Sequence, residues 1–119
     1  MAAPHFHKER LAGQLQREIT NVIARELRDP RIPPIVTITR VQLGTDLRNA
    51  TIFVSLMEEQ EKRQEIVDAM NKAAPYIQRL VAVRIKIKHF PRIYFKNDDA
   101  LEHSQHIHKL LEDINHELE

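Results

Sequence analysis

The residues with the most direct chemical meaning are basic side chains between positions 72 and 96, a stretch that contains no acidic residue. They are Lys72, Arg79, Arg84, Lys86, Lys88, Arg92 and Lys96. Cations gathered in one place create a local field that attracts a polyanion, and their ammonium and guanidinium groups can contact its phosphates. This stretch predicts a surface that binds nucleic acid.

The acidic residues are segregated from this stretch, although the net charge of the whole chain is only +1. Residues 58–68 contain five acidic residues and residues 98–119 contain seven. Such segregation favours a polyanionic partner for the basic surface. Because the exposed faces of helices also differ in charge by chance, charge alone leaves an ordinary solvated surface as the alternative.

Further arginines extend the basic surface if the segments that carry them lie beside it: Arg31, Arg40 and Arg48. Arg31 follows Asp29-Pro30, which ends the first predicted helix because the residue before a proline is pushed out of helical geometry. A cation there can contact a phosphate, or it can stabilise the negative end of the helix dipole. The sequence leaves both interpretations open.

The composition excludes several other kinds of protein. The chain has no cysteine, which excludes disulfides, thiolate zinc ligands and a thiol nucleophile, and suits a reducing cytosol. Its apolar runs are far shorter than the roughly 20 residues of a spanning helix, and its N-terminal residues lack the apolar region of a secretory signal. We therefore expect a cytoplasmic protein that does not contact membranes.

No catalytic motif is present: the sequence has no P-loop, no nucleophile elbow and no HExxH zinc motif. His103 and His106 share one face of a predicted helix, where a metal could be imagined, but a zinc site needs three or four converging ligands. Surface histidines explain this pair, and the alternating His5 and His7, more simply. We expect no enzymatic activity, no cofactor and no bound metal.

Hydrophobic periodicity predicts the elements that present these side chains. Residues 5–28 and 100–118 have the three- and four-residue spacing of amphipathic helices, and residues 35–43 and 49–57 read as strands. The alternation slips near Arg40, which indicates a β-bulge. The two strands are expected to pair as a hairpin.

Residues 59–74 return to helical spacing, and the same apolar phase continues to Arg84 across Pro75. Proline removes one helical hydrogen bond and its ring clashes with the preceding turn. We therefore expect either a kink or a second helix that starts at Pro75. Residues 84–88 also alternate, and we interpret them as the end of the helix passing into extended chain.

Pro91 opens the last predicted strand, which places Arg92, Tyr94 and Lys96 on one face. Tyr94 could stack on a base, but packing also explains a half-exposed strand tyrosine. Because only 5% of the residues are aromatic, we expect shape and phosphate recognition of folded RNA to dominate over base reading.

This order of elements predicts a single α+β domain over residues 1–119, with a three-stranded sheet and helices packed on one of its faces. Residues 1–5 are expected to be flexible, and the open face of the sheet would show the basic side of the last strand.

An ordered set of local motifs resembles the ribosome-binding factor A family of bacteria, which has a type II KH-like domain. The motifs are Gln16-Arg17-Glu18-Ile19, Asp29-Pro30-Arg31, Val36-Thr37-Ile38-Thr39, Asp46-Leu47-Arg48-Asn49-Ala50, Ile52-Phe53-Val54, Asn71-Lys72-Ala73-Ala74, Pro91-Arg92-Ile93-Tyr94-Phe95 and Asp98-Asp99. They occur in this order between residues 6 and 112, so the resemblance covers nearly the whole chain. It implies the order helix, strand, strand, kinked helix pair, strand and helix.

The resemblance also implies a function. Members of the family are non-catalytic assembly factors that bind the immature small ribosomal subunit, contact its rRNA, assist late maturation around the rRNA 5′ end and then leave. We expect a monomer in the cytoplasm, with the small subunit as partner and no small-molecule substrate. The expected RNA-binding residues are Lys72, Arg79, Arg84, Lys86, Lys88, Arg92, Lys96, Arg31 and Arg48.

In the family, an Ala-x-Gly kink between two helices replaces the GxxG loop of other KH domains. Ala73, Ala74 and Pro75 are the corresponding kink residues here. Proline stands where the family has glycine, so the chain departs from the family pattern at that residue.

Two other functions stay open. The acidic segment 100–118 could dock on another protein, which would make the chain a protein-interaction module, although its apolar stripe is more simply explained by packing on the domain's own core. The chain could also be a general KH-type RNA-binding protein with other targets, a reading that the missing GxxG loop disfavours.

Overall fold

The structure, a computed structural model, describes residues 4–98 of the chain. Its elements are α1 (Pro4–Arg25), β1 (Thr37–Leu43), β2 (Asn49–Ser55), α2 (Gln60–Arg84) and β3 (Arg92–Asn97). This order confirms the α+β architecture predicted up to the last strand. The predicted helix at residues 100–118, with His103 and His106, lies outside the described residues.

The three strands form one sheet in the order β1-β2-β3. β1 and β2 pair antiparallel as the expected hairpin, with a register shift between Ile38 and Arg40 that confirms the predicted bulge. β3 lies parallel to β2. Since parallel neighbours require a crossover connection, α2 carries the chain back across the sheet between them.

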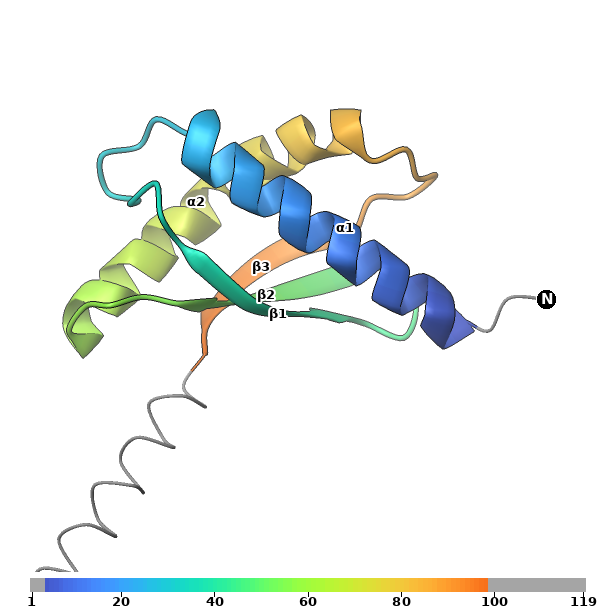
Figure 1. Ribbon diagram of the computed structural model, residues 1–119, viewed down its shortest axis with the longest axis horizontal. Helices are drawn as coiled ribbons and strands as arrows, with labels where there is room; N and C mark the ends of the chain where they lie inside the picture. The colour runs from blue at the N-terminus through green and yellow to red at the C-terminus, as the bar shows by residue number, and fades with distance from the viewer. Residues whose placement is uncertain (1–3, 99–119) are drawn as a thin grey trace, which may run out of the picture.

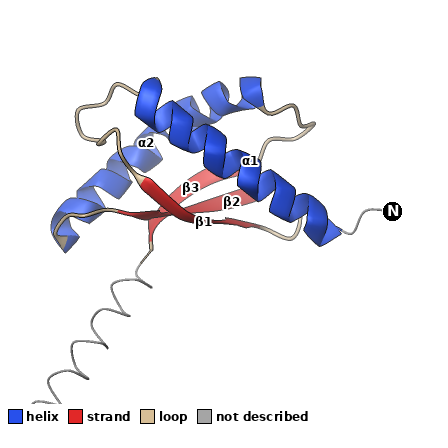
Figure 2. Ribbon diagram, in the orientation of Figure 1, coloured by secondary structure: helices blue, strands red, loops and turns tan. Residues whose placement is uncertain are grey.

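Both helices cover the same face of the sheet, and no element within residues 4–98 covers the other face, which we call the open face (Figures 1 and 2). The core between the two layers contains side chains from every element. Its fully buried members include Leu15, Ile19, Val22, Ile23, Ile52, Val54, Met70, Ile77, Val81 and Phe95. The layered packing predicted from the order of elements is therefore present.

α1 ends three residues earlier than the predicted boundary at residue 28. The carbonyl of Val22 accepts hydrogen bonds from the backbone N–H groups of both Glu26 and Leu27, at 2.9 and 2.8 Å, which closes the last turn. The chain then leaves helical geometry before Pro30. Along α1, the Gln16 side chain donates to the Ile38 carbonyl at 3.0 Å and so ties the helix to β1.

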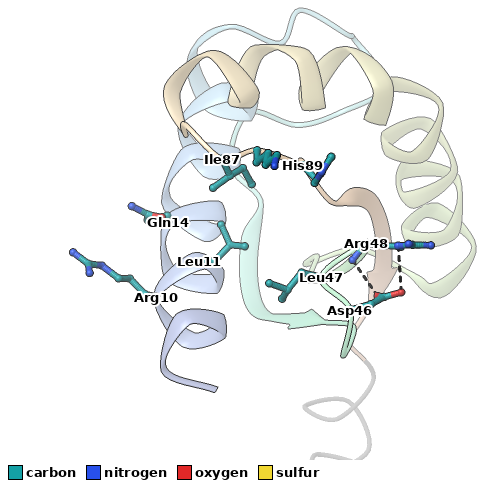
Figure 3. Close-up of a pocket in the computed structure, with 9 residues that line it drawn as sticks. Arg10, Leu11, Gln14, Asp46, Leu47, Arg48, Ile87 and His89 are labelled. Carbon is teal, nitrogen blue, oxygen red and sulfur yellow. Dashed lines mark hydrogen bonds and ion pairs between the residues drawn. The ribbon is translucent and has the colours of Figure 1, made fainter. Parts of the chain in front are cut away.

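Of the two outcomes expected at Pro75, a kink or a second helix, the structure has the first: α2 is one continuous helix with Pro75 inside it. Its ribbon bends along its length, as Figures 1 and 3 show. Pro75 is exposed, so its ring projects into solvent, and only one helical hydrogen bond is missing. Buried residues run along α2 on both sides of Pro75, from Ile66 to Val81, and hold its two halves against the same sheet. The helix therefore bends without restarting.

The segment after α2 behaves as predicted, because the helix passes into extended chain. Ile85 has φ −113° and ψ 110°, and its N–H donates the last helical bond to the Val81 carbonyl at 3.0 Å. Its side chain is buried, which anchors the start of the connection to β3.

The free edge of β3 is secured by Asn71 of α2. The Arg92 N–H donates to the carbonyl of Arg48, just before β2, and the Asp98 N–H donates to the carbonyl of Val54 in β2, which leaves the polar backbone groups of Phe95 on the opposite edge. The Asn71 side-chain oxygen accepts the Phe95 N–H at 2.7 Å, and its amide donates to the Phe95 carbonyl at 3.0 Å. One side chain therefore replaces a missing strand at this point.

Substituting Asn71→Ala should lower the free energy of unfolding by about 1–3 kcal/mol, because it leaves a half-buried backbone donor and acceptor without partners. Urea denaturation followed by circular dichroism measures this change. Lys72→Ala is the matched control, since Lys72 is its exposed neighbour on the same helix and should change stability by less than about 0.5 kcal/mol. Equal effects of the two substitutions would contradict the bridging role of Asn71.

Candidate nucleic-acid interface

A hollow of about 1200 Å³ lies where the middle of α2 passes the first half of β3. Its helix side consists of Asn71, Ala74, Pro75, Gln78 and Arg79. Its sheet side consists of Arg48, Asn49, Thr51, Phe90, Arg92, Ile93 and Tyr94. Two of the three predicted kink residues therefore line this hollow.

A smaller hollow of about 230 Å³ continues along the first half of α2. It is lined by Gln60, Arg63, Gln64, Val67, Tyr94, Phe95, Lys96 and Asn97. Tyr94 lines both hollows, and the Asn71–Phe95 bridge lies between them. We call the two hollows together the α2–β3 groove.

The described lining of the α2–β3 groove is basic. Of the lining residues within 4–98, five are cationic and none is acidic: Arg48, Arg63, Arg79, Arg92 and Lys96. Arg48 is 84% exposed and its Nε lies 3.8 Å from the Asp46 carboxylate, so this pair is loose and leaves the guanidinium accessible to a ligand. A groove with this charge attracts an anionic chain and can contact several of its phosphates.

The ring of Tyr76 contacts the guanidinium of Arg79 and so orients that side chain. The guanidinium carbon of Arg79 lies 5.8 Å from the ring centroid of Tyr76, within the range of a cation–π contact. Both side chains are exposed beside Pro75. The contact holds one groove cation near the bend of α2.

Sequence reasoning missed Arg63. Its sequence neighbours include Glu61 and Glu65, so the segment reads as acidic when charges are counted along the chain. Arg63, Val67 and Asn71 recur at four-residue steps, however, and such residues share one face of a helix. That helical spacing is the signal that could have separated Arg63 from its acidic neighbours.

The predicted RNA-binding residues do not all meet at the groove. Arg48, Arg79, Arg92 and Lys96 line it. Lys72 and Lys86 are exposed outside its lining. Arg31 lies in the loop after α1, and Figure 1 shows that loop and the turn carrying Arg48 at opposite ends of α1.

Arg84 connects the two helices. Its guanidinium forms an ion pair with Glu26 of α1, and its Nε lies 3.7 Å from the Glu18 carboxylate. Two carboxylates compete with any phosphate for this cation. The predicted role of Arg84 in phosphate binding is therefore disfavoured by its ion pairs.

Lys88 lies at a second cavity, of about 760 Å³, between α1, the β1–β2 turn and the α2–β3 connection (Figure 3). Figure 3 shows Leu11, Leu47 and Ile87 directed toward the same space, whereas Arg10 extends away from it. Leu47 adopts φ 59°, the left-handed region, which is uncommon for a leucine. Arg48 lines both this cavity and the α2–β3 groove, so the cavity adjoins the groove.

Arg31 is held by its own loop. The Asp29 carboxylate accepts hydrogen bonds from the Arg31 backbone N–H at 2.9 Å and from its guanidinium at 2.8 and 3.0 Å. These bonds lower the pKa of Asp29 from 3.8 to about 2 and raise the pKa of Arg31. The interaction completes the turn after α1, which gives Arg31 a local structural role.

Within residues 4–98, the chain holds no group of three or more histidine, aspartate or glutamate side chains that could bind a metal ion. This part of the chain also has no helix long and apolar enough to cross a bilayer.

The fold and the groove define a class of protein: a type II KH-like α+β domain with a basic groove between its long helix and the edge strand. The sequence model of the family described as ribosome-binding factor A matches residues 7–111. The chain belongs to that family.

Relatives with that name are similar over nearly their whole length. The ribosome-binding factor A of Thermomicrobium roseum is 40% identical over 114 residues, which cover 96% of this chain and 88% of that protein. The protein from Natranaerobius thermophilus is 39% identical over 110 residues, covering 92% and 83%.

Solved structures agree with this assignment. The crystal structure of ribosome-binding factor A from Thermus thermophilus matches with a TM-score of 0.68 and 27% identity, covering 78% of this chain and 97% of that one. The solution structure of a Thermotoga maritima protein, a putative ribosome-binding factor A by its title, matches with a TM-score of 0.69 and 30% identity, covering 77% and 87%.

Replacing Arg84 should affect stability more than RNA binding, because its charge is shared by two carboxylates of α1. We expect Arg84→Gln to lower the free energy of unfolding by up to about 1 kcal/mol, the range of half-exposed ion pairs, and to change RNA affinity less than twofold. Arg79→Gln should show the opposite pattern, with a clear loss of affinity and little loss of stability. Denaturation and a filter-binding titration on the same variants measure both quantities, and a larger affinity loss for Arg84→Gln would contradict this assignment.

The Asp29–Arg31 pair predicts a specific acid titration. The Asp29 carboxyl should titrate with a pKa of about 2, and Arg31→Ala should return the pKa toward 3.8. Since the folded-state pKa is lowered, the stabilisation is complete above pH 3.8 and is lost as the pH falls toward 2. NMR detection of the carboxyl carbon during acid titration measures both values. An unchanged pKa in Arg31→Ala would show that Arg31 is not the cause.

Proposed function

We propose that this protein is a non-catalytic factor of small-subunit biogenesis. It binds the rRNA of the immature small ribosomal subunit through the α2–β3 groove and assists late maturation, including processing at the rRNA 5′ end. It acts in the cytoplasm, as a monomer when it is not on the subunit, and without a cofactor. Membership of the ribosome-binding factor A family supports this proposal.

A structural relative supports the choice of partner. A homology model of Thermus thermophilus ribosome-binding factor A was fitted into a cryo-electron-microscopy map of the complex of that factor with the 30S subunit. It matches this chain with a TM-score of 0.59 and 25% identity, covering 74% of this chain and 91% of that one. Because the two domains share the same fold, we expect the same kind of partner here.

The observation that carries the proposal is the charge of the groove. Among its described lining residues, five are cations and none is a carboxylate, and the cations come from α2, from β3 and from the turn before β2. The cations contributed by α2, Arg63 and Arg79, lie eight residues to either side of Asn71, about 12 Å each way along a helix. Cations distributed over such a length can contact successive phosphates of one RNA backbone. Phosphate contacts supply affinity and position but carry no sequence information.

Sedimentation of a cell lysate tests the function. The protein should migrate with free small subunits and not with translating ribosomes. The double substitution Arg79→Glu and Arg92→Glu should abolish this co-migration, because it replaces two groove cations with anions. Arg17→Glu is the matched control, since Arg17 is exposed on α1, away from the groove, and it should leave co-migration intact.

Salt dependence gives a second readout for the same variants. If about five phosphates are contacted, log Kd against log salt should have a slope of roughly 3.5–4.5 in magnitude, at about 0.7–0.9 per contact. The double substitution removes two of these contacts and should lower the magnitude of that slope by roughly 1.4–1.8. Salt-independent binding, or binding that survives the double substitution, would show that RNA contacts a different surface.

A further inference from the structure

The open face of the sheet carries two aromatic rings that are not part of the main core. Ile52 and Val54 of β2 face the helices, so Phe53 between them points to the opposite face. Phe53 is nevertheless only 8% exposed. Tyr94 of β3 is on the same face and is 58% exposed.

Phe53 is covered by Arg40. The guanidinium carbon of Arg40 lies 4.0 Å from the centroid of the Phe53 ring, a close cation–π stack. Arg40 itself is exposed, so the ring closes one side of the guanidinium while solvent reaches its other side. The pair presents a flat cationic surface in the middle of the open face.

The β-bulge is what places Arg40 there. Ile38 pairs with Val54, and continuing that register would set Arg40 opposite Ile52, on the face covered by the helices. The shift sets Arg40 opposite Phe53 instead. Bulges commonly re-aim a side chain in this way. Val41 consequently pairs with Ile52 and packs against the core.

Cations surround the two rings. Lys96 pairs with Phe53 from the other side, so Arg40, Phe53 and Lys96 form one row across the three strands. Tyr94 pairs with Thr51 in the adjacent row, which makes it a diagonal neighbour of Phe53, at a typical distance of about 7–8 Å. Arg92 continues the basic edge. The three strands themselves contain no acidic residue, and the Asp98 carboxylate, directly after β3, accepts a hydrogen bond from the Thr39 hydroxyl of β1.

We propose that this face binds unpaired nucleotides of an RNA strand by stacking. One base stacks on Tyr94, and a neighbouring base stacks on the solvent side of the Arg40 guanidinium, which Phe53 holds flat. Lys96 and Arg92 contact the phosphates. The inference rests on the proposed function, because the strand is taken to be part of the RNA bound in the α2–β3 groove.

The chemistry of the face favours RNA over a protein partner. A peptide that docks on a sheet face needs aliphatic surface, and the face offers threonine, glutamine and asparagine around its two rings. Aromatic rings and arginine planes stack on bases of any sequence, and single strands are the form in which bases are accessible to them. Tyr94 also lines the groove, so one strand can pass from the groove onto the face.

The chain offers a direct optical test, since it has two tyrosines and no tryptophan. Tyr76→Phe keeps the ring beside Arg79 and leaves Tyr94 as the only tyrosine. A short oligouridine should quench the fluorescence of this variant in a saturable titration, because a stacked base quenches tyrosine emission. A duplex RNA of the same length should quench it much less. Absence of quenching while the oligouridine binds, or equal quenching by the duplex, would overturn the proposal.

Substitutions separate stacking from charge. Arg40→Lys keeps the charge but removes the planar guanidinium, and we expect it to weaken oligouridine binding by about 5-fold or more, as does Tyr94→Leu. Tyr94→Phe keeps the aromatic ring and should bind oligouridine as the wild type does. Gln42→Ala, on the same face, should also leave the affinity unchanged. Circular dichroism establishes that each variant is folded. Unchanged affinity in folded Arg40→Lys and Tyr94→Leu would overturn the proposal.

Sedimentation distinguishes a failure of the stacking proposal from a failure of the proposed function. If bases do not stack on Tyr94 and Arg40, the Tyr94→Leu and Arg40→Lys variants still migrate with small subunits as strongly as the wild type does. If the proposed function is wrong, the wild-type protein itself does not migrate with them.

Discussion

The two hydrogen bonds between the Asn71 amide and the backbone of Phe95 fix the long helix against the edge of the sheet. β3 is an edge strand, and an unpaired edge is a place where another chain can add. Asn71 satisfies that edge at one point and sets the position of α2 along β3. The cations of α2 thereby come to lie opposite those of β3, so the α2–β3 groove depends on this contact.

The cations of the protein have two kinds of surroundings: some are bound to carboxylates, and others line the groove. Arg84 and Arg31 are each held by carboxylates, which tie one helix to the other and close the loop after α1. The described lining of the groove brings five cations together with no carboxylate among them. Arg84 and Arg31 stabilise the fold through their carboxylate partners, whereas the exposed Arg48 and Arg92 present their charge to solvent along the groove. The same residue type thus serves two purposes, depending on the residues around it.

The bulge in β1 connects the core to the open face. It lets Ile38 and Val41 both point toward the helices although they are three residues apart, and it turns Arg40 to the outside over Phe53. A regular strand could not meet both demands, because side chains alternate strictly between the two faces. One extra residue therefore provides an uninterrupted core on one side of the sheet and a stacked cation on the other.

The sequence by itself determined the order of the described elements, the bulge near Arg40 and the basic face of β3, because hydrophobic periodicity and proline positions act locally. It could not decide whether Pro75 bends or breaks the helix, since the answer depends on packing of buried residues on both sides of it. Nor could it show that Arg63 belongs to the groove or that Arg84 is paired with α1. Those outcomes depend on which side chains meet across elements distant in the sequence. Only the tertiary structure decided them, because charge counted along the chain does not reveal which face of a helix, or which neighbour, each charge will meet.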